Sequence, residues 1–202
     1  AQAWVEAFTA FGHKLEFDQV RPLIGMGGDR IIPKFLPGCS DKEGEGKKIA
    51  DRRKELIIDK FAAKLAPANG SRDLIIKMQQ QGLRLLIASS ATSEELSVLL
   101  KVAQVDDLLS QDEATTSSDT EASKPEPDLI QVALKRLEMQ PDRVVMIGDT
   151  PYDIEAAQKV GIRTIAFRCG GFNDEQLKNA IAIYHDPADL LEHYDDSPLS
   201  NS

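Results

Sequence analysis

Two aspartates stand where an expected β-strand gives way to a helix, and their spacing is the strongest chemical signal in the sequence. Gly148 and Asp149 follow the apolar run Val144–Ile147, which has the length and composition of a strand. Thr150 and Pro151 suit the N-cap and the first position of a helix, so Asp153 is expected at the third helical position. The helix dipole alone accounts for a carboxylate at that position, but it does not account for Asp149.

Two carboxylates at one strand end repel each other unless a cation lies between them. Hard oxygen ligands suit Mg²⁺, which takes few protein carboxylates and completes its coordination with phosphate and water. Asp149 and Asp153 are therefore the predicted metal ligands, and Mg²⁺ is the predicted cofactor. A bound cation would also give an acidic protein the local positive charge that an anionic substrate needs.

Two further polar features lie beside expected elements. Ser89 and Ser90 follow the apolar run Leu83–Ala88, and Lys124 lies in the segment Ser123–Pro127 before an expected helix. Taken singly, a serine at a strand end is most often a turn former, and a lysine before proline is most often a solvated surface residue. Only in combination with the two aspartates do these residues indicate a function.

The C-terminal two thirds of the chain alternate between helix and strand patterns. Helices are expected over residues 71–82, 92–103, 127–138, 151–160 and 188–192, and strands over 83–88, 144–147, 163–167 and 181–183. A polar loop rich in Ser, Thr and Asp is expected between residues 103 and 127. Such alternation favours a doubly wound parallel sheet, whose ligands bind at the carboxyl ends of the strands.

The first 66 residues show helical patterns and turns but no convincing strand. Trp4, Phe8 and Phe11 lie on one face of an expected helix that Gly12 ends, and a long amphipathic helix is expected over residues 46–65. The segment Ile24–Asp29 superficially suggests a phosphate loop. Because no strand precedes it and no Lys-Ser/Thr pair follows, a turn is the favoured interpretation.

Composition restricts the possible functions. The formal net charge of −9 and the pI near 4.9 argue against binding to nucleic acid. The two cysteines, Cys39 and Cys169, lack partners at metal-site spacing and are expected to be reduced thiols in a cytoplasmic protein. No apolar run reaches the length of a transmembrane helix, so no membrane partner is expected.

The three polar features, in this order, resemble the later motifs of the haloacid dehalogenase superfamily. The resemblance rests on the segments Leu85–Ser90, Ser123–Asp128 and Val144–Ile154. The rest of the chain is similar to the phosphoglycolate phosphatase and β-phosphoglucomutase-like branch, in which a helical cap is inserted. The resemblance implies an α/β protein with a Rossmann-like core at residues 67–202 and an α-helical cap at residues 1–66.

The superfamily's first motif, Asp-x-Asp-Gly-Thr after an apolar strand, has no counterpart in the sequence. Asp18, Asp29, Asp41 and Asp51 all lie in helical or turn contexts. In the family, the first Asp of that motif is the nucleophile and the second is the general acid. The expectation is therefore an inactive fragment that lacks the N-terminal strand of the core.

The resemblance implies Mg²⁺-dependent hydrolysis of a small phosphorylated metabolite through an aspartyl-phosphate intermediate. The implied roles are catalytic for Ser89, Lys124 and Asp149, substrate-binding for Ser90 and Arg30, and metal-binding for Asp149 and Asp153. Three alternatives stay open: a phosphosugar mutase, a haloacid dehalogenase that works without metal, and a catalytically inactive binding protein. Neither the substrate nor the oligomeric state follows from the sequence.

Overall fold

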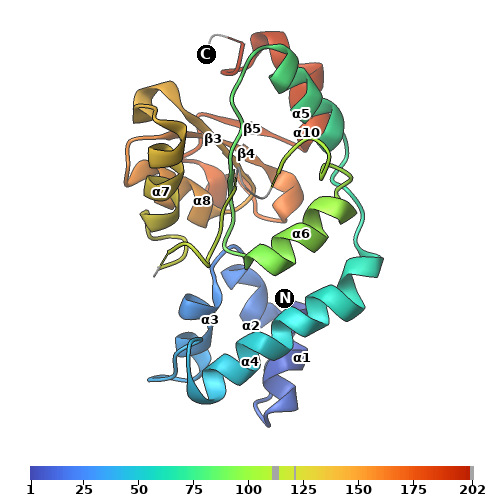
Figure 1. Ribbon diagram of the computed structural model, residues 1–202, viewed down its shortest axis with the longest axis vertical. Coiled ribbons are helices and arrows are strands. Elements are labelled where there is room, and N and C mark those ends of the chain that lie inside the picture. Colours follow the sequence, from blue (N-terminus) through green and yellow to red (C-terminus); the bar gives the residue numbers. More distant parts are fainter. Residues whose placement is uncertain (111–113, 121, 201–202) are drawn as a thin grey trace. The chain divides into compact units, whose positions relative to one another are not determined.

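The computed structural model describes residues 1–110, 114–120 and 122–200 (Figure 1). The chain forms two compact units, Ala1–Leu65 and Ala66–Ser202. The first unit consists of helices and turns, and we call it the helical unit. The second alternates helices with parallel strands, and we call it the α/β unit.

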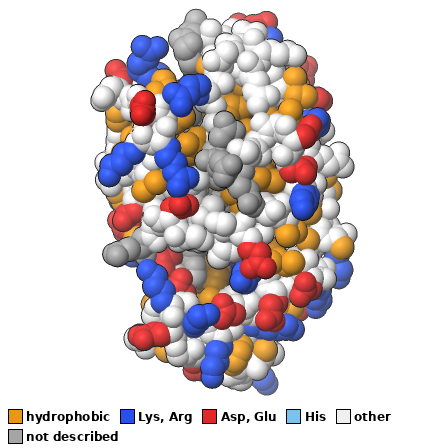
Figure 2. Space-filling model, viewed as in Figure 1, with side chains coloured by type: hydrophobic (Ala, Val, Ile, Leu, Met, Phe, Trp, Pro, Cys, Tyr) orange, Lys and Arg blue, Asp and Glu red, His pale blue; other side chains and the backbone are white. Residues whose placement is uncertain are grey.

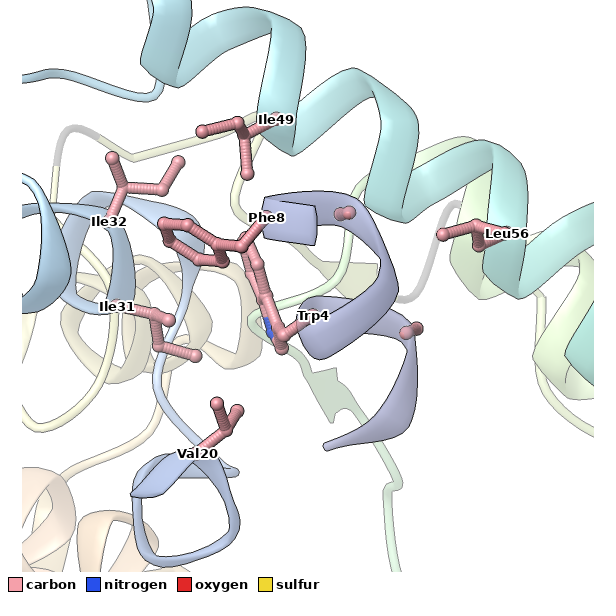
Figure 3. Close-up of a cluster of buried hydrophobic side chains, with 9 residues drawn as sticks. Trp4, Phe8, Val20, Ile31, Ile32, Ile49 and Leu56 are labelled. Carbon is pink, nitrogen blue, oxygen red and sulfur yellow. The ribbon is translucent and has the colours of Figure 1, made fainter. Parts of the chain in front are cut away.

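The helical unit is held together by its own apolar core. Its helices are α1 (Gln2–Ala10), α2 (Phe17–Val20), α3 (Gly28–Phe35) and α4 (Gly44–Glu55), and α4 continues as a π-helical turn (Leu56–Phe61) and a 3-10 turn (Ala62–Lys64). The side chains of Trp4, Phe8 and Ile49 meet in this core together with those of Ile31 and Ile32 (Figure 3). The predicted apolar face of α1 is confirmed, since Trp4 and Phe8 are both buried.

The α/β unit contains five strands and their connecting helices within its described residues. In chain order they are α5 (Ser71–Gln80), β1 (Ile87–Ala88), α6 (Ser93–Val102), β2 (Ala114–Thr115), α7 (Asp128–Leu137), β3 (Val145–Gly148), α8 (Pro151–Gln158), β4 (Arg163–Phe167), α9 (Asp174–Leu177), β5 (Ala182–Tyr184) and α10 (Pro187–Glu192). All strand pairs are parallel, β1 with β2 and β3 with β4 and β5. The predicted α/β class is thus confirmed.

Helices cover both faces of the β3–β4–β5 sheet. On one face, Leu74 of α5 and Leu190 of α10 pack against Ile165 and Phe167 of β4. On the other face, α7 and α8 pack against Val144 and Met146, and Ile154 packs against Ala166. Alternate residues of each strand therefore point into two separate apolar layers, as the period of two in a strand requires.

Three details differ from the sequence-based expectation. The strand expected over Leu83–Ala88 is assigned only at Ile87–Ala88, because a strand is defined by pairing and the described residues give Leu83–Leu86 no sheet partner. The short strand β2 lies in the segment expected to be a polar loop. Helix α5 has Gly70 at its N-cap, with φ of +73°, and Ser71 is the first helical residue instead of the cap.

Candidate active site

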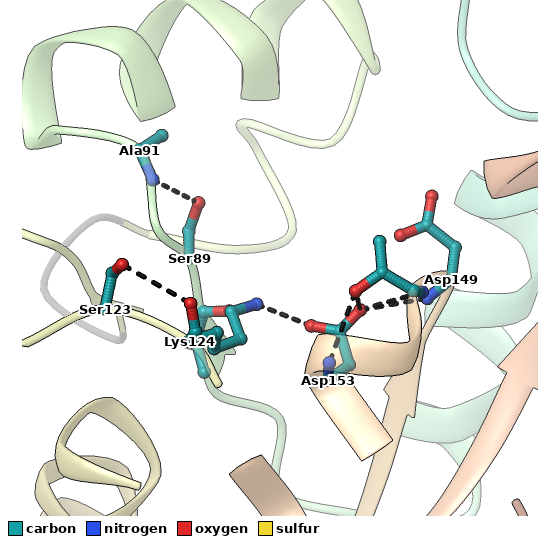
Figure 4. Close-up of polar contacts among 8 residues, drawn as sticks. Ser89, Ala91, Ser123, Lys124, Asp149 and Asp153 are labelled. Atoms are coloured by element: carbon teal, nitrogen blue, oxygen red, sulfur yellow. Dashed lines mark hydrogen bonds and ion pairs between the residues drawn. The ribbon is translucent and has the colours of Figure 1, made fainter. Parts of the chain in front are cut away.

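A buried ion pair between Lys124 and Asp153 forms the centre of the candidate site (Figure 4). The distance from Lys124 Nζ to Asp153 Oδ1 is 2.7 Å, and the two side chains are only 9% and 6% exposed. Lys124 Nζ also donates a hydrogen bond to the carbonyl oxygen of Ala88, at 3.1 Å. Ala88 ends β1, and Asp153 lies in the first turn after β3. One ammonium group therefore joins the carboxyl ends of two strands that belong to different sheets.

Asp153 is fixed by the start of α8. Its Oδ2 accepts hydrogen bonds from Thr150 Oγ1 at 2.8 Å and from the Thr150 amide at 3.0 Å. The Asp153 amide donates in return to Thr150 Oγ1, which completes a capping box. The predicted N-cap at Thr150, with Pro151 following it, is thus confirmed.

Burial alone would raise the pKa of the Asp153 carboxyl group, because a charge is costly away from water. The charge of Lys124 and the hydrogen bonds from Lys124 and Thr150 outweigh that effect. The pKa of Asp153 is therefore held below its ordinary value of 3.8. Asp153 is ionised at neutral pH and serves as the counter-ion of Lys124.

Two glycines allow the backbone to close around the aspartates. A Cβ atom added at Gly148 would lie 2.6 Å from the Cβ of Asp153, and one added at Gly170 would lie 2.1 Å from the carbonyl oxygen of Asp149. Both distances are far below van der Waals contact. Only glycine lets the backbone at these two positions approach the aspartates so closely. The two glycines therefore help to position Asp149 and Asp153.

Asp149 follows β3 directly and is exposed. Figure 4 shows its carboxylate directed away from the Lys124–Asp153 pair. Within the described ranges of the chain, no cluster of three or more His, Cys, Asp or Glu side chains could hold a metal ion. Joint metal binding by Asp149 and Asp153 stays a prediction.

The two serines lie at the end of β1. The Ser89 amide donates to the carbonyl oxygen of Thr115 at 2.9 Å, which extends the β1–β2 pairing by one residue. Ser89 Oγ accepts a hydrogen bond from the Ala91 amide at 3.1 Å. Ser90 follows in the bend before α6. Ser89 and Lys124 are thus both anchored to the carboxyl end of β1, since Lys124 binds Ala88.

Arg30 belongs to the helical unit. It lies in α3, where its Nε is 3.4 Å from Oδ2 of Asp29. Its predicted contact with substrate stays a prediction.

The sequence did not predict a network of hydroxyl groups that follows β2. Thr116 is buried, and its Oγ1 lies 3.1 Å from Ser93 Oγ and 2.9 Å from Oδ2 of Asp119. Arg136 of α7 holds the other carboxylate oxygen of Asp119, at 2.8 Å. The network joins the end of β2 to the start of α6 and to the last turn of α7. Because β2 is only two residues long, no apolar run marked this segment as a strand end.

The chain belongs to the haloacid dehalogenase-like hydrolase family, since the family model of that description matches residues 1–167. One curated relative is the Arabidopsis thaliana protein SUPPRESSOR OF QUENCHING 1, chloroplastic, which is 31% identical over 174 residues. That match covers 83% of this chain but 16% of the relative. The chain also spans less than half the length of the curated pyrophosphatases that it matches.

Solved structures of this family share the fold. A hydrolase from Pseudomonas syringae superimposes with a TM-score of 0.86 at 24% identity, covering 96% of this chain and 89% of that one. CbbY from Rhodobacter sphaeroides, in complex with xylulose-(1,5)bisphosphate, gives a TM-score of 0.76 at 25% identity, with 94% and 87% covered. The fold is therefore the Rossmann-like fold of this family, together with its helical cap.

In the described part of the chain, no helix is both long enough and apolar enough to cross a membrane.

Proposed function

We propose that this chain carries the phosphate-binding and metal-binding half of a phosphohydrolase site that acts on a small phosphorylated metabolite. The observation that carries the proposal is the ammonium of Lys124, held at the carboxyl ends of β1 and β3 by Ala88 and Asp153. In parallel α/β sheets this edge is where ligands bind. Because the chain belongs to a hydrolase family, the ligand proposed at this edge is the substrate of a hydrolysis reaction.

Lys124 and Ser89 would bind the phosphoryl group. An ammonium has three donors, and two of those of Lys124 are directed to Asp153 and Ala88. The third would neutralise a phosphoryl oxygen. Ser89 Oγ accepts from the Ala91 amide, so its own proton is the group that would donate to the same phosphoryl group. The backbone of Ser90 would supply a further donor. Phosphoryl transfer depends mainly on such positioning and charge stabilisation.

Asp149 and Asp153 would hold Mg²⁺. Asp149 presents an exposed carboxylate directly after β3, which fits a hard cation that takes one or two protein oxygens. Both oxygens of Asp153 already accept hydrogen bonds, so Asp153 would support the cation through water. Bound Mg²⁺ would supply charge neutralisation for the phosphoryl oxygens. Asp149 would orient it, while Asp153 continues to fix Lys124.

Neither Asp149 nor Asp153 is proposed as the nucleophile or the general acid. The two carboxylates of the described site are committed to Lys124 and, by proposal, to the metal. We therefore propose that the chain of 202 residues does not turn over, and that the aspartyl-phosphate chemistry requires carboxylates from outside it.

The helical unit is proposed as the cap domain that selects the substrate. The proposed bounds are residues 1–66 for the cap and residues 67–202 for the core domain. Arg30 of α3 would contact a substrate anion. Because CbbY was solved with a sugar bisphosphate, a phosphorylated sugar is the first substrate class to test. Replacing Arg30 by Gln should then raise KM and leave kcat nearly unchanged, as expected for lost uniform binding.

Phosphate release from p-nitrophenyl phosphate and from sugar phosphates tests the function, measured on this chain and on the gene product that contains it. The gene product should be active with Mg²⁺ and inactive with a chelator. Lys124→Met should lower its kcat on the order of 10²–10³-fold, the usual cost of a lost charge-stabilising donor. Lys178→Met, at an exposed position, is the matched control.

Four outcomes of this assay would each favour an alternative to the proposed function. Turnover by this chain at the rate of the gene product would overturn the proposed inactivity. A gene product without turnover on any phosphate ester would favour a binding protein. An isomerised sugar phosphate without free phosphate would indicate a mutase, and activity that survives chelation would favour a dehalogenase.

The cytoplasm is the proposed location, because both cysteines are free thiols in the structure. The printed name of the Arabidopsis relative includes the word chloroplastic. Fractionation of cells that express the gene product separates the two locations.

A further inference from the structure

Ser89 lies in a short loop, residues 89–91, that we call the serine loop. The Ser89 amide donates a hydrogen bond to the carbonyl oxygen of Thr115 at 2.9 Å, and the Ser117 amide donates one to the carbonyl oxygen of Ala91 at 3.1 Å. Both ends of the loop are therefore bonded to one segment at the end of β2. Because β1 and β2 pair over only two residues each, these two bonds supply much of the support of the loop.

Asp119 holds this supporting segment, residues 115–117, in place. Its Oδ2 accepts hydrogen bonds from the amide of Thr116 at 2.8 Å and from Thr116 Oγ1 at 2.9 Å. The Asp119 amide donates in return to the carbonyl oxygen of Thr116, at 3.0 Å. Since Thr116 is only 3% exposed, one carboxylate fixes the buried middle residue of the segment through both its backbone and its side chain.

The same carboxylate sets the direction of the neighbouring hydroxyl groups. An ionised carboxylate can only accept, so the single hydroxyl proton of Thr116 is directed to Asp119. The contact of 3.1 Å between Thr116 Oγ1 and Ser93 Oγ then takes its proton from Ser93. Ser93 is the first residue of α6, just after the serine loop. Asp119 is therefore connected to both sides of that loop.

Arg136, in the last turn of α7, holds Asp119 from the other side. Its guanidinium donates to Oδ1 of Asp119 at 2.8 Å and to the carbonyl oxygen of Ala114, the first residue of β2. The hydrogen bond from the Thr116 amide holds the pKa of Asp119 below its ordinary value of 3.8, and the charge of Arg136 adds to this effect. Asp119 is thus ionised at neutral pH, as the hydroxyl directions require.

An exposed pair of this kind elsewhere in the α/β unit provides a comparison. Figure 2 shows Lys and Arg side chains interspersed with Asp and Glu side chains on one face of the chain, and such surface pairs typically contribute little to stability. Arg72 binds both carboxylate oxygens of Asp107, at 2.6 and 2.7 Å, and also the carbonyl oxygen of Gln104. Within the described part of the chain, however, Asp107 accepts no hydrogen bond from a hydroxyl group.

We infer that Asp119 is a positioning residue for phosphoryl binding, which acts through Thr116 on the serine loop. The inference rests on the proposed function, in which Ser89 donates a hydrogen bond to the phosphoryl group. Ser89 Oγ accepts from the Ala91 amide, so the direction of its proton depends on the shape of the loop. Without Asp119 the supporting segment loses its anchor, and the Ser89 hydroxyl is misdirected in the transition state.

A double-mutant cycle in the gene product that contains this chain tests the inference. Asp119→Ala should lower kcat about tenfold and change KM by less than about twofold, as expected for a contact made in the transition state. In the Ser89→Ala background the same substitution should have no further effect, because Asp119 acts through Ser89. Full and independent losses from the two substitutions would overturn the inference.

Two further comparisons separate positioning from a general loss of stability. Thr116→Val removes only the hydroxyl group and should lower kcat about threefold, whereas Thr116→Ser keeps that group and should leave kcat unchanged. Asp107→Ala is the matched control, since it removes an Asp from an equivalent pair with Arg, and it should also leave kcat unchanged. Equal losses of kcat in Asp119→Ala and Asp107→Ala would overturn the inference.

Hydrogen exchange of this chain, followed by NMR, tests the same support without any turnover. In Asp119→Ala the amides of Ala91 and Ser117 should exchange about tenfold faster, and in Asp107→Ala they should not change. Unchanged exchange at both amides, or an equal acceleration throughout the α/β unit, would overturn the inference. A gene product that hydrolyses no phosphate ester would instead refute the proposed function, and the exchange rates would still decide whether Asp119 supports the serine loop.

Discussion

Among single residues, Lys124 and Asp153 make the most consequential contact. Removal of one partner of a buried ion pair leaves an uncompensated charge away from water, which typically costs about 3–5 kcal/mol. Lys124→Met should therefore lower the free energy of unfolding by about that amount, measured by urea titration. The double variant Lys124→Met/Asp153→Asn should recover much of the loss. Equal effects of Lys124→Met and of the exposed control Lys178→Met would contradict this.

The same pair makes stability depend on acid. The pKa of Asp153 is lower in the folded chain than its ordinary value of 3.8. A lowered carboxyl pKa stabilises the fold above the unfolded value, and this contribution disappears as the pH falls through the folded value. Between pH 7 and pH 5 the contribution should be constant, and it should decline below about pH 4. Urea midpoints across this range should show a steeper acid decline for the natural chain than for the double variant.

Gly148 permits a contact that no other residue allows. A methyl group there would lie 2.6 Å from the Cβ of Asp153, so Gly148→Ala should cost about 1–3 kcal/mol through overpacking. Gly82 is the control, because its added Cβ meets nothing within 4 Å while its φ is +78°. Gly82→Ala should reveal the backbone cost alone. Only Gly148→Ala should also disturb the Asp153 carboxyl resonance in NMR spectra.

At the scale of elements, two helices begin with the same device and allow a matched comparison. Thr150 caps α8 in a box with Asp153, and Thr92 caps α6 in a box with Glu95. Replacing either threonine by Ala should cost about 1 kcal/mol of stability. Thr150→Ala should additionally raise the pKa of Asp153, since that carboxylate loses a donor, whereas Thr92→Ala should not. Rescue by Thr150→Ser would separate the lost hydrogen bond from lost packing.

The elements also show what the sequence can predict. Helix α8 and its cap were predictable because their signals are local, and strand β4 was predicted with its observed bounds, 163–167. The capping box of α6 was predictable from the spacing of Thr92 and Glu95. Strand β1 was predicted too long, because its length depends on pairing and not on the composition of Leu83–Leu86. The short strand β2 left no apolar pattern to detect.

The sequence alone could propose residues for the candidate site, but it could not predict their contacts. Residue types and their positions after strands pointed to Ser89, Lys124, Asp149 and Asp153. The pairing of Lys124 with Asp153, which are 29 residues apart, has no signature in the sequence. It follows only from the way β1 and β3 bring their carboxyl ends to one ammonium group.

At the scale of the whole molecule, each unit has its own core. The apolar cluster around Trp4 contains residues of the helical unit only, and the remaining clusters contain residues of the α/β unit only. Trp4 is the single tryptophan, so its fluorescence reports on the helical unit. Lys124→Met should lower the urea midpoint measured by circular dichroism more than that measured by tryptophan fluorescence. Identical shifts would show that the two units unfold as one.

The buried ion pair also restricts how this sequence can change over generations. A lineage that loses Lys124 first carries an isolated aspartate, and one that loses Asp153 first carries an isolated ammonium. Each single variant is less stable than the chain with both residues and than the chain with both replaced. Selection therefore acts on the two codons together. We expect the two positions to vary in concert across descendants of this chain, and substitution rates at the exposed Lys178 to show no such linkage.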